Sequence, residues 1–112
     1  MILEHALLPV RREQISAFER AMAQALPIIR RQPGCRSAQV TRCVEDGDTY
    51  LLLVRWEHLE DHDPGFRGST DYQEWRALLH RFYDPFPVVQ HFAVVPELEQ
   101  PDPPGPGLGS AG

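Results

Sequence analysis

Residues 35–56 read CRSAQVTRCVEDGDTYLLLVRW, and this stretch decides the fold. Two runs, residues 35–44 and 49–56, flank the turn signal Glu45-Asp46-Gly47-Asp48. An Asp-Gly pair supplies the positive backbone angles that a tight hairpin requires. The second run is rich in Leu, Val, Tyr and Trp on both faces, which is typical of a central strand covered on two sides. We therefore predict two antiparallel strands joined by a hairpin.

A helix is predicted before this hairpin. From Arg11 onward, apolar side chains recur every three or four residues, which is the period of an amphipathic helix. They are Ile15, Phe18, Met22, Leu26 and Ile29. Pro27 removes one amide hydrogen bond, so we expect a bend or an early end there, before a stop at Pro33-Gly34.

A second helix is predicted after the hairpin. Residues 57–63 are acidic and can form one helical turn before a break at Pro64-Gly65. The second helix then begins near Ser69, which can cap it, and stops at residues 84–87. Its apolar positions at helical spacing are Tyr72, Trp75, Leu78, Leu79 and Phe82.

Residues 2–8 and 88–95 complete the pattern as first and fourth strands. The order strand, helix, strand, strand, helix, strand is the split unit of an α+β, ferredoxin-like sandwich. It predicts a four-stranded antiparallel sheet with two helices on one face. The other face would be apolar and bare, so we predict a homodimer that pairs sheet to sheet.

Composition predicts one domain and a tail. The chain has 112 residues, enough for a single core. Residues 96–112 hold five of the eleven prolines and four of the eight glycines. We therefore expect a working domain over residues 1–95 and a Pro/Gly-rich tail over residues 96–112.

Several classes of protein are disfavoured. Apolar runs such as residues 51–54 fall far short of the roughly 20 residues that cross a bilayer. The net charge is -5 and the arginines are scattered, so neither a membrane nor nucleic acid is an expected partner. Cys35 and Cys43 would lie about 26 Å apart in one strand, too far for a disulfide. Because no signal-peptide pattern opens the chain, we expect a cytoplasmic location.

Three strings carry a family resemblance: WEHLEDH at residues 56–62, GFRGSTDYQEW at 65–75 and PVVQHF at 87–92. With them the chain resembles the antibiotic biosynthesis monooxygenase family over roughly residues 1–95. The resemblance implies a dimeric α+β barrel with a pocket between the helices and the concave sheet. Members of that family oxidise aromatic polyketide intermediates or quinols with O2 and no metal or flavin, degrade haem, or isomerise small sugar-derived signals.

A cofactor-free oxygenase needs a base, and two histidines are candidates for it. His62 stands where the family often has a histidine, and Asp61 and Asp63 can orient its ring; the alternative is a surface histidine in a solvated acidic turn. His91 lies on the fourth strand, which pairs with the first, so we expect it near His5. Its alternative is a hydrogen-bonded histidine of the core or interface.

Aromatic side chains are the candidate substrate walls. Tyr72 can donate its hydroxyl to a developing oxyanion, while Phe66, Trp75 and Trp56 can line the pocket. Core packing is the alternative for all four. Arg76 can hold an anionic group, although a helix arginine more often faces solvent.

Metal and haem chemistry are the weaker predictions. His58 and His62 are four residues apart, but His-Leu-Glu-Asp-His is not a zinc-protease pattern. In the haem-degrading branch the iron ligand is a histidine of the second helix, and the alignment puts Arg76 at that position. His80, one turn further on, would serve only if the pocket shifted.

The sequence therefore predicts a cytoplasmic, homodimeric monooxygenase that oxidises a small aromatic or quinol-like substrate with O2 and without a cofactor or metal. The catalytic candidates are His62, His91 and Tyr72; the substrate-binding candidates are Trp56, Phe66, Trp75, Arg76 and His5. The alternatives are a non-catalytic ligand-binding dimer and an isomerase of the same fold, with haem degradation behind both.

Overall fold

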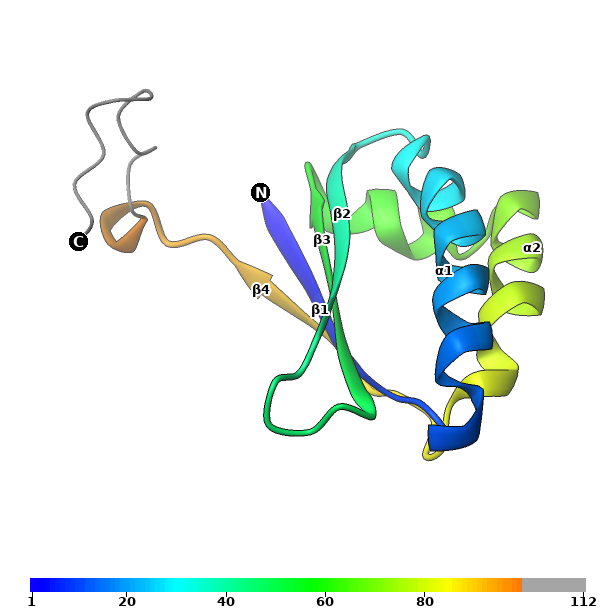
Figure 1. Ribbon diagram of the computed structural model, residues 1–112. Coiled ribbons are helices and arrows are strands. Elements are labelled where there is room, and N and C mark those ends of the chain that lie inside the picture. Colours follow the sequence, from blue (N-terminus) through cyan, green and yellow to red (C-terminus); the bar gives the residue numbers. More distant parts are fainter. Residues whose placement is uncertain (100–112) are drawn as a thin grey trace, which may run out of the picture.

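The computed structural model describes residues 1–99 as a four-stranded antiparallel sheet covered on one face by two helices (Figure 1). The strands are β1 (Ile2–Pro9), β2 (Cys35–Arg42), β3 (Thr49–Trp56) and β4 (Val89–Ala93), and their order in the sheet is β2-β3-β1-β4. The helices are α1 (Ile15–Arg30) and α2 (Thr70–Leu79). The predicted α+β, ferredoxin-like fold is confirmed. Residues 100–112 of the predicted tail lie outside the described residues.

Short helical turns connect these elements. They are η1 (Arg12–Gln14), η2 (Asp61–Phe66), η3 (His80–Phe82) and η4 (Pro96–Leu98). In Figure 1, β4 leads away from the two helices toward η4. No helix among residues 1–99 is long and apolar enough to cross a bilayer.

The β2–β3 connection is longer than the tight hairpin that the Asp-Gly pair predicts. The strands pair from Arg42 opposite Tyr50, and residues 43–48 form the loop. Gly47 does not adopt a positive φ. Instead the Asp46 carboxylate accepts hydrogen bonds from the Asp48 N–H (3.2 Å) and the Thr49 hydroxyl (3.0 Å), so a side chain holds this turn.

The ends of the helices test three expectations. α1 does not end at Pro27 but runs to Arg30, because a proline so close to the last turn removes only one bond from the ladder. The stop at Pro33-Gly34 is confirmed, with Gly34 at φ 82°. The cap at Ser69 is also confirmed, since its side chain accepts a hydrogen bond from the Tyr72 N–H.

The acidic stretch before α2 forms a helical turn that breaks where predicted. The backbone is extended at Asp63 (φ -140°, ψ 110°), directly before Pro64-Gly65, so η2 consists of two helical pieces joined at a kink. Its winding is wider than that of an α-helix, because the Arg67 N–H donates to the His62 carbonyl five residues earlier (3.0 Å).

Alternation along β1 separates the two faces of the sheet. Glu4, Ala6 and Leu8 are buried under the helices, and His5 and Leu7 point to the other side. On that bare face Leu7 is 53% exposed and Phe92 on β4 is 48% exposed. A single subunit thus has one covered and one uncovered apolar sheet face.

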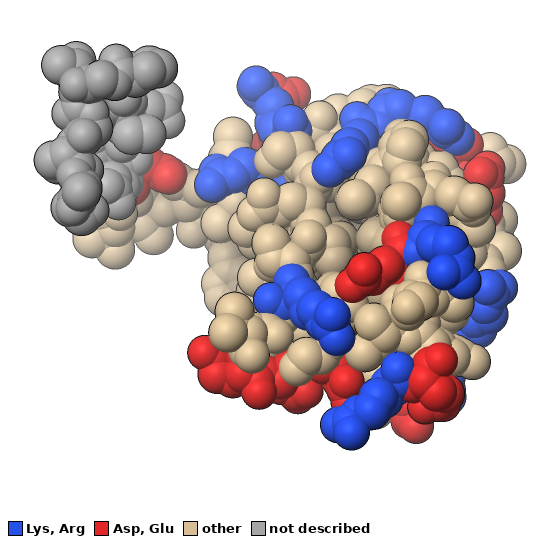
Figure 2. All heavy atoms as spheres, viewed as in Figure 1, with Lys and Arg blue, Asp and Glu red and all other residues tan. Residues whose placement is uncertain are grey.

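Charge is distributed unevenly over the face seen in Figure 2. Acidic side chains gather where the β2–β3 loop lies in Figure 1, whereas the basic side chains are spread over the same view. The loop itself contains Glu45, Asp46 and Asp48.

Candidate active site

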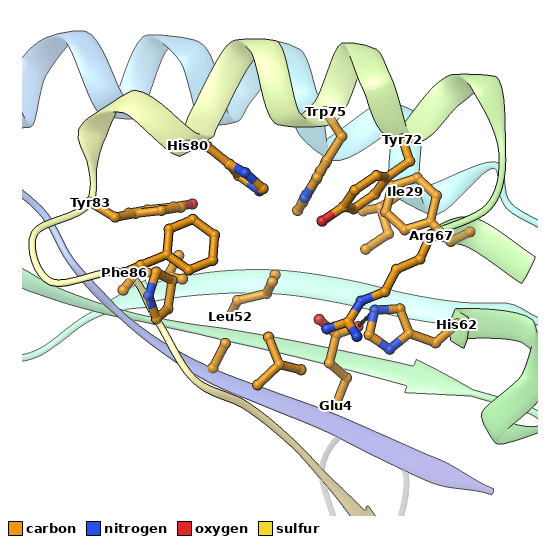
Figure 3. A pocket seen from close by; sticks show the side chains of 15 residues that line it. Glu4, Ile29, Leu52, His62, Arg67, Tyr72, Trp75, His80, Tyr83 and Phe86 are labelled. Atoms are coloured by element: carbon orange, nitrogen blue, oxygen red, sulfur yellow. Dashed lines mark ion pairs between the residues drawn. The ribbon is translucent and has the colours of Figure 1, made fainter. Parts of the chain in front are cut away.

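A cavity of about 70 Å³ lies between the covered face of the sheet and α2 (Figure 3). β1 and β3 supply its floor, and η2, α2 and the segment before β4 supply its walls. Glu4, His62 and Arg67 meet at one end, and His80, Tyr83 and Phe86 gather at the other. We call these the polar end and the aromatic end.

Glu4 is the buried carboxylate of the polar end. Its Oε1 accepts a hydrogen bond from the Trp56 indole Nε1–H (2.9 Å) and lies 3.3 Å from His62 Nε2. Both the Glu4 and the His62 side chains are 4% exposed. Burial raises the pKa of Glu4, while the Trp56 hydrogen bond and the nearby Arg67 charge act against that rise.

His62 lies at the centre of the polar end. Its ring stacks on the Trp56 indole, with centroids 5.3 Å apart and planes 17° from parallel. Its Nδ1 lies 2.7 Å from Nε2 of His91 on β4. Burial, followed by the Arg67 and His91 charges, lowers the pKa of His62 to about 4, so the imidazole is neutral near pH 7.

His91 extends this group of side chains outward. It pairs with Glu4 in the β1–β4 register and is half-buried. Burial and the Arg67 charge lower its pKa as well. Glu4, His62 and His91 therefore form a continuous chain of polar side chains from the cavity toward the surface.

Two glycines allow the η2 turn that carries His62. A Cβ atom on Gly65 would lie 2.8 Å from the Glu60 carbonyl oxygen, and one on Gly68 would lie 2.7 Å from the Pro64 carbonyl oxygen. These approaches are too close for any other residue without a backbone shift. Glycine at both positions lets the wide turn close, and the turn directs His62 and Phe66 inward.

The remaining walls are aromatic. Phe66 makes edge contacts with Tyr72 (centroids 5.3 Å apart) and Trp75 (5.7 Å apart), and all three line the cavity. Figure 3 shows the Tyr72 hydroxyl inside the cavity, above the polar end. Tyr72, Phe66 and Trp75 are thus brought together where the sequence predicted a substrate pocket.

The aromatic end reaches solvent. Phe86 is 60% exposed, and its ring packs edge-on against His80 with centroids 4.9 Å apart. Burial raises the pKa of the Tyr83 phenol and lowers that of the His80 imidazole. This end contains the hydrogen-bonding groups of His80 and Tyr83, and the exposed Phe86 ring lies on its outer side.

Three predicted binding residues lie elsewhere. Trp56 is buried behind His62 and supports Glu4 rather than lining the cavity. Arg76 is exposed, because its position on α2 faces solvent. His5 lies on the bare face of the sheet, opposite Gln90 and against Phe92. His5 and His91 are close neighbours on the paired strands β1 and β4, as expected, but they point to opposite faces, so the prediction of His5 as a binding residue of the pocket is wrong.

The surface alternative proposed for His62 describes His58 instead. The His58 side chain is 74% exposed and lies 3.5 Å from the Asp61 carboxylate. Within residues 1–99, no group of three His, Cys, Asp or Glu side chains is arranged to hold a metal ion.

Sequence reasoning missed Glu4, Arg67, Tyr83 and Phe86 as cavity residues, and considered His80 only as an iron ligand. One signal was available for Glu4. Because it alternates with Ala6 and Leu8 on β1, the period of a strand places this acid on the buried face. The other three follow from tertiary packing alone.

Comparison with known proteins identifies the family. A family model described as antibiotic biosynthesis monooxygenase matches residues 1–78. The chain belongs to the antibiotic biosynthesis monooxygenase family. The resemblance predicted from the three sequence strings is thereby confirmed.

Three known proteins illustrate what this chain resembles in sequence or structure. The uncharacterized protein YczJ of Bacillus subtilis (strain 168) is 52% identical over 92 residues, which cover 82% of this chain and 97% of YczJ. A candidate antibiotic biosynthesis monooxygenase from Bordetella bronchiseptica is 36% identical, with a TM-score of 0.79, and the match covers 84% of this chain and 96% of that one. SnoaB, a cofactor-independent oxygenase from Streptomyces nogalater, shares the fold at 14% identity and a TM-score of 0.71, over 83% of this chain and 91% of SnoaB.

Proposed function

We propose that this protein is a cofactor-independent monooxygenase that oxidises a small aromatic or quinol-like substrate with O2. One observation carries the proposal: a buried carboxylate–imidazole pair opens into a cavity walled by aromatic side chains. Family membership, and structural neighbours described as monooxygenases, support the reaction class. The polar end supplies the proton acceptor, and the aromatic walls supply a water-poor site for a flat ring.

The chemistry needs one base and no external reductant. Loss of a proton from a phenol gives an electron-rich anion, which passes one electron to O2. The two radicals join to form a carbon–oxygen bond, and the resulting peroxide releases water. A phenol and one O2 thus give a quinone and one water, and the substrate supplies all four electrons. His62 and its partners hold the proton until it leaves in that water.

Tyr72 is proposed as the donor to the developing oxyanion. Its hydroxyl points into the cavity above Glu4 and His62 (Figure 3). A hydroxyl placed before the reaction begins stabilises the anion without reorganisation.

The volume of the cavity sets a condition on binding. Pockets for organic ligands measure about 300–1,000 Å³, whereas this one measures about 70 Å³. We therefore propose that a ring compound enters by displacing Phe86, the exposed side chain of the aromatic end.

We also propose a homodimer that pairs the bare sheet faces. Leu7 and Phe92 expose apolar surface there, and burial of that surface in a second copy is favourable. Light scattering should give a molar mass of twice 12.8 kDa for the wild type. Leu7→Asp should give the mass of a monomer, whereas Leu59→Asp, which lies outside the sheet, should remain a dimer. A monomeric wild type contradicts the dimer.

A reducing cytoplasm stays a prediction, supported by the free thiols of Cys35 and Cys43.

Oxygen uptake tests the reaction. The protein is incubated with a panel of phenols and quinols in an oxygen electrode, and His62→Gln is compared with His58→Gln. The proposal expects uptake with at least one substrate, a loss of about 10²–10⁴-fold in His62→Gln, and no loss in His58→Gln. Substrate isomerised without oxygen uptake would identify an isomerase, and a bound but unchanged substrate would identify a binding protein.

A further inference from the structure

Both ring nitrogens of His62 are already engaged. Nδ1 lies 2.7 Å from His91 Nε2, and Nε2 lies 3.3 Å from Glu4 Oε1. Both imidazole nitrogens therefore face protein partners. The Glu4 carboxylate lines the cavity, and its contacts with Trp56 and His62 both fall on Oε1. Its second oxygen is the atom that we assign to the substrate proton.

We propose that Glu4 takes the substrate proton and that His62 and His91 connect it to the surface as a proton relay. This inference rests on the proposed monooxygenase function and assigns the order of groups within its polar end. Glu4 and His62 both line the cavity, and Glu4 is assigned as the catalytic residue because both ring nitrogens of His62 face protein partners. His62 and His91 act through it, and Trp56 is a positioning residue that holds Oε1.

The relay passes one proton outward in two steps. In the first state, Glu4 is ionised, His62 Nε2–H donates to Glu4, and His91 Nε2–H donates to His62 Nδ1. Glu4 takes the substrate proton, and tautomerisation of both imidazoles from Nε2–H to Nδ1–H then gives the second state. There the Glu4 hydroxyl donates to His62 Nε2, His62 Nδ1–H donates to His91 Nε2, and His91 carries its proton on Nδ1, so one more proton is held and no member is charged. Release of the His91 Nδ1 proton, with one shift along each contact, restores the first state.

The surroundings favour uncharged imidazoles in both states. The Arg67 charge lowers the pKa of both His62 and His91 and so disfavours imidazolium, while Asp63, which pairs with Arg67 (3.2 Å), acts in the opposite direction. Burial makes Glu4 easier to protonate than an ordinary glutamate. Cys35, across from Trp56 on β2, is a neutral thiol whose pKa is raised by burial and by the Glu4 charge. The relay therefore carries a proton without forming a buried cation.

Kinetics of matched variants test the relay. Glu4→Gln keeps an acceptor for Trp56 and His62 but removes the base, so turnover should fall by about 10²–10⁴-fold. His91→Ala should lose turnover in dilute buffer and recover it when imidazole is added, because His91 is half-buried and a free imidazole can take its place. His58→Ala, exposed and outside the relay, should show neither effect. Full turnover in Glu4→Gln, or a loss in His91→Ala that imidazole does not restore, would overturn the proposal.

A titration by NMR tests the relay without any substrate. The chain has two tryptophans, so the indole N–H signal of Trp56 can be assigned with Trp75→Phe and followed in the wild type. The NMR signals of the Trp56 indole and the His91 ring should shift together as pH falls. The midpoint should lie above 4.5, the ordinary pKa of glutamate. The shared transition should disappear in Glu4→Gln, which leaves the His91 ring with only its own titration, and should remain in His58→Ala. Independent titration of the two ends would contradict a relay.

The two tests separate this inference from the proposed function. If the wild type consumes no oxygen with any substrate, the monooxygenase proposal fails, while the NMR titration still decides the relay. If the wild type consumes oxygen and Glu4→Gln does so equally, the function stands and the relay is wrong.

Discussion

Different interactions hold the two ends of the cavity. At the polar end, Glu4 and His62 are almost wholly buried and are held by Trp56 and His91 through hydrogen bonds. At the aromatic end, Phe86 is 60% exposed and is held by ring contacts with His80 and Tyr83. The first arrangement suits a proton acceptor that must stay in place, and the second suits an entrance. The predictions below rest on this contrast.

The largest difference should appear in stability. Trp56→Ala removes a fully buried indole and should lower the free energy of unfolding by about 3–5 kcal/mol, whereas Phe86→Ala should change it by no more than about 0.5 kcal/mol. Urea unfolding of both variants measures this. Equal losses would show that the aromatic end is as tightly built as the polar end.

The polar end should also make stability depend on pH. The pKa of His62 is about 4 in the folded protein and 6.5 in an ordinary histidine, so the folded chain binds fewer protons than the unfolded chain between these values. Stability from this group is therefore complete above pH 6.5 and is lost as pH falls toward 4. Lowering the pH from 6.5 to 5 should cost roughly 2 kcal/mol.

Glu4 acts in the opposite sense, because its raised pKa makes protonation on folding favourable as pH falls toward 4.5. The difference between the wild type and His62→Gln isolates the histidine contribution. Thermal unfolding from pH 7 to 5 should show a steeper decline in the wild type. Parallel curves would mean that His62 is not buried as a neutral imidazole.

The aromatic end should control entry. Phe86→Ala removes the ring that covers the cavity and should speed association of a phenolic ligand by about tenfold. Stopped-flow quenching of tryptophan fluorescence measures the rate, since Trp75 lines the cavity. An unchanged rate would place the entrance elsewhere.

The smallest effect is expected at Arg76, which the sequence placed in the pocket and the structure places at the surface. Arg76→Gln should change ligand affinity and stability by less than about 0.5 kcal/mol. Calorimetric titration with the same phenol provides the measurement. A clear loss of affinity would return Arg76 to the binding site.

Periodicity predicted most of the fold, because each element buries one face. The spacing of three or four residues between the apolar side chains of α1 reports on local burial, and the cap at Ser69 reports on a local hydrogen bond. The errors arose where local rules compete with tertiary contacts. At residues 43–48, Asp46 side-chain bonds replace the Asp-Gly turn, and α1 continues past Pro27 to Arg30.

The candidate site was only partly predictable for a related reason. The sequence strings that carry the family resemblance contain His62, Phe66, Tyr72 and Trp75, so these residue types were informative. The polar end also needs Glu4 and His91, which are far apart in sequence and meet only when β1 pairs with β4. Residue type alone did not separate His62 from His58. The wide η2 turn buries His62, which lowers its pKa, whereas the His58 side chain lies in solvent.

Isotope labelling tests the central claim, monooxygenation, most directly. The wild type is given its substrate under ¹⁸O2, and the product and the dissolved oxygen are analysed together. We predict one O2 consumed per product and one labelled oxygen atom in each product molecule, with the other atom in water. A product that forms without oxygen uptake, or that carries no label, would contradict it.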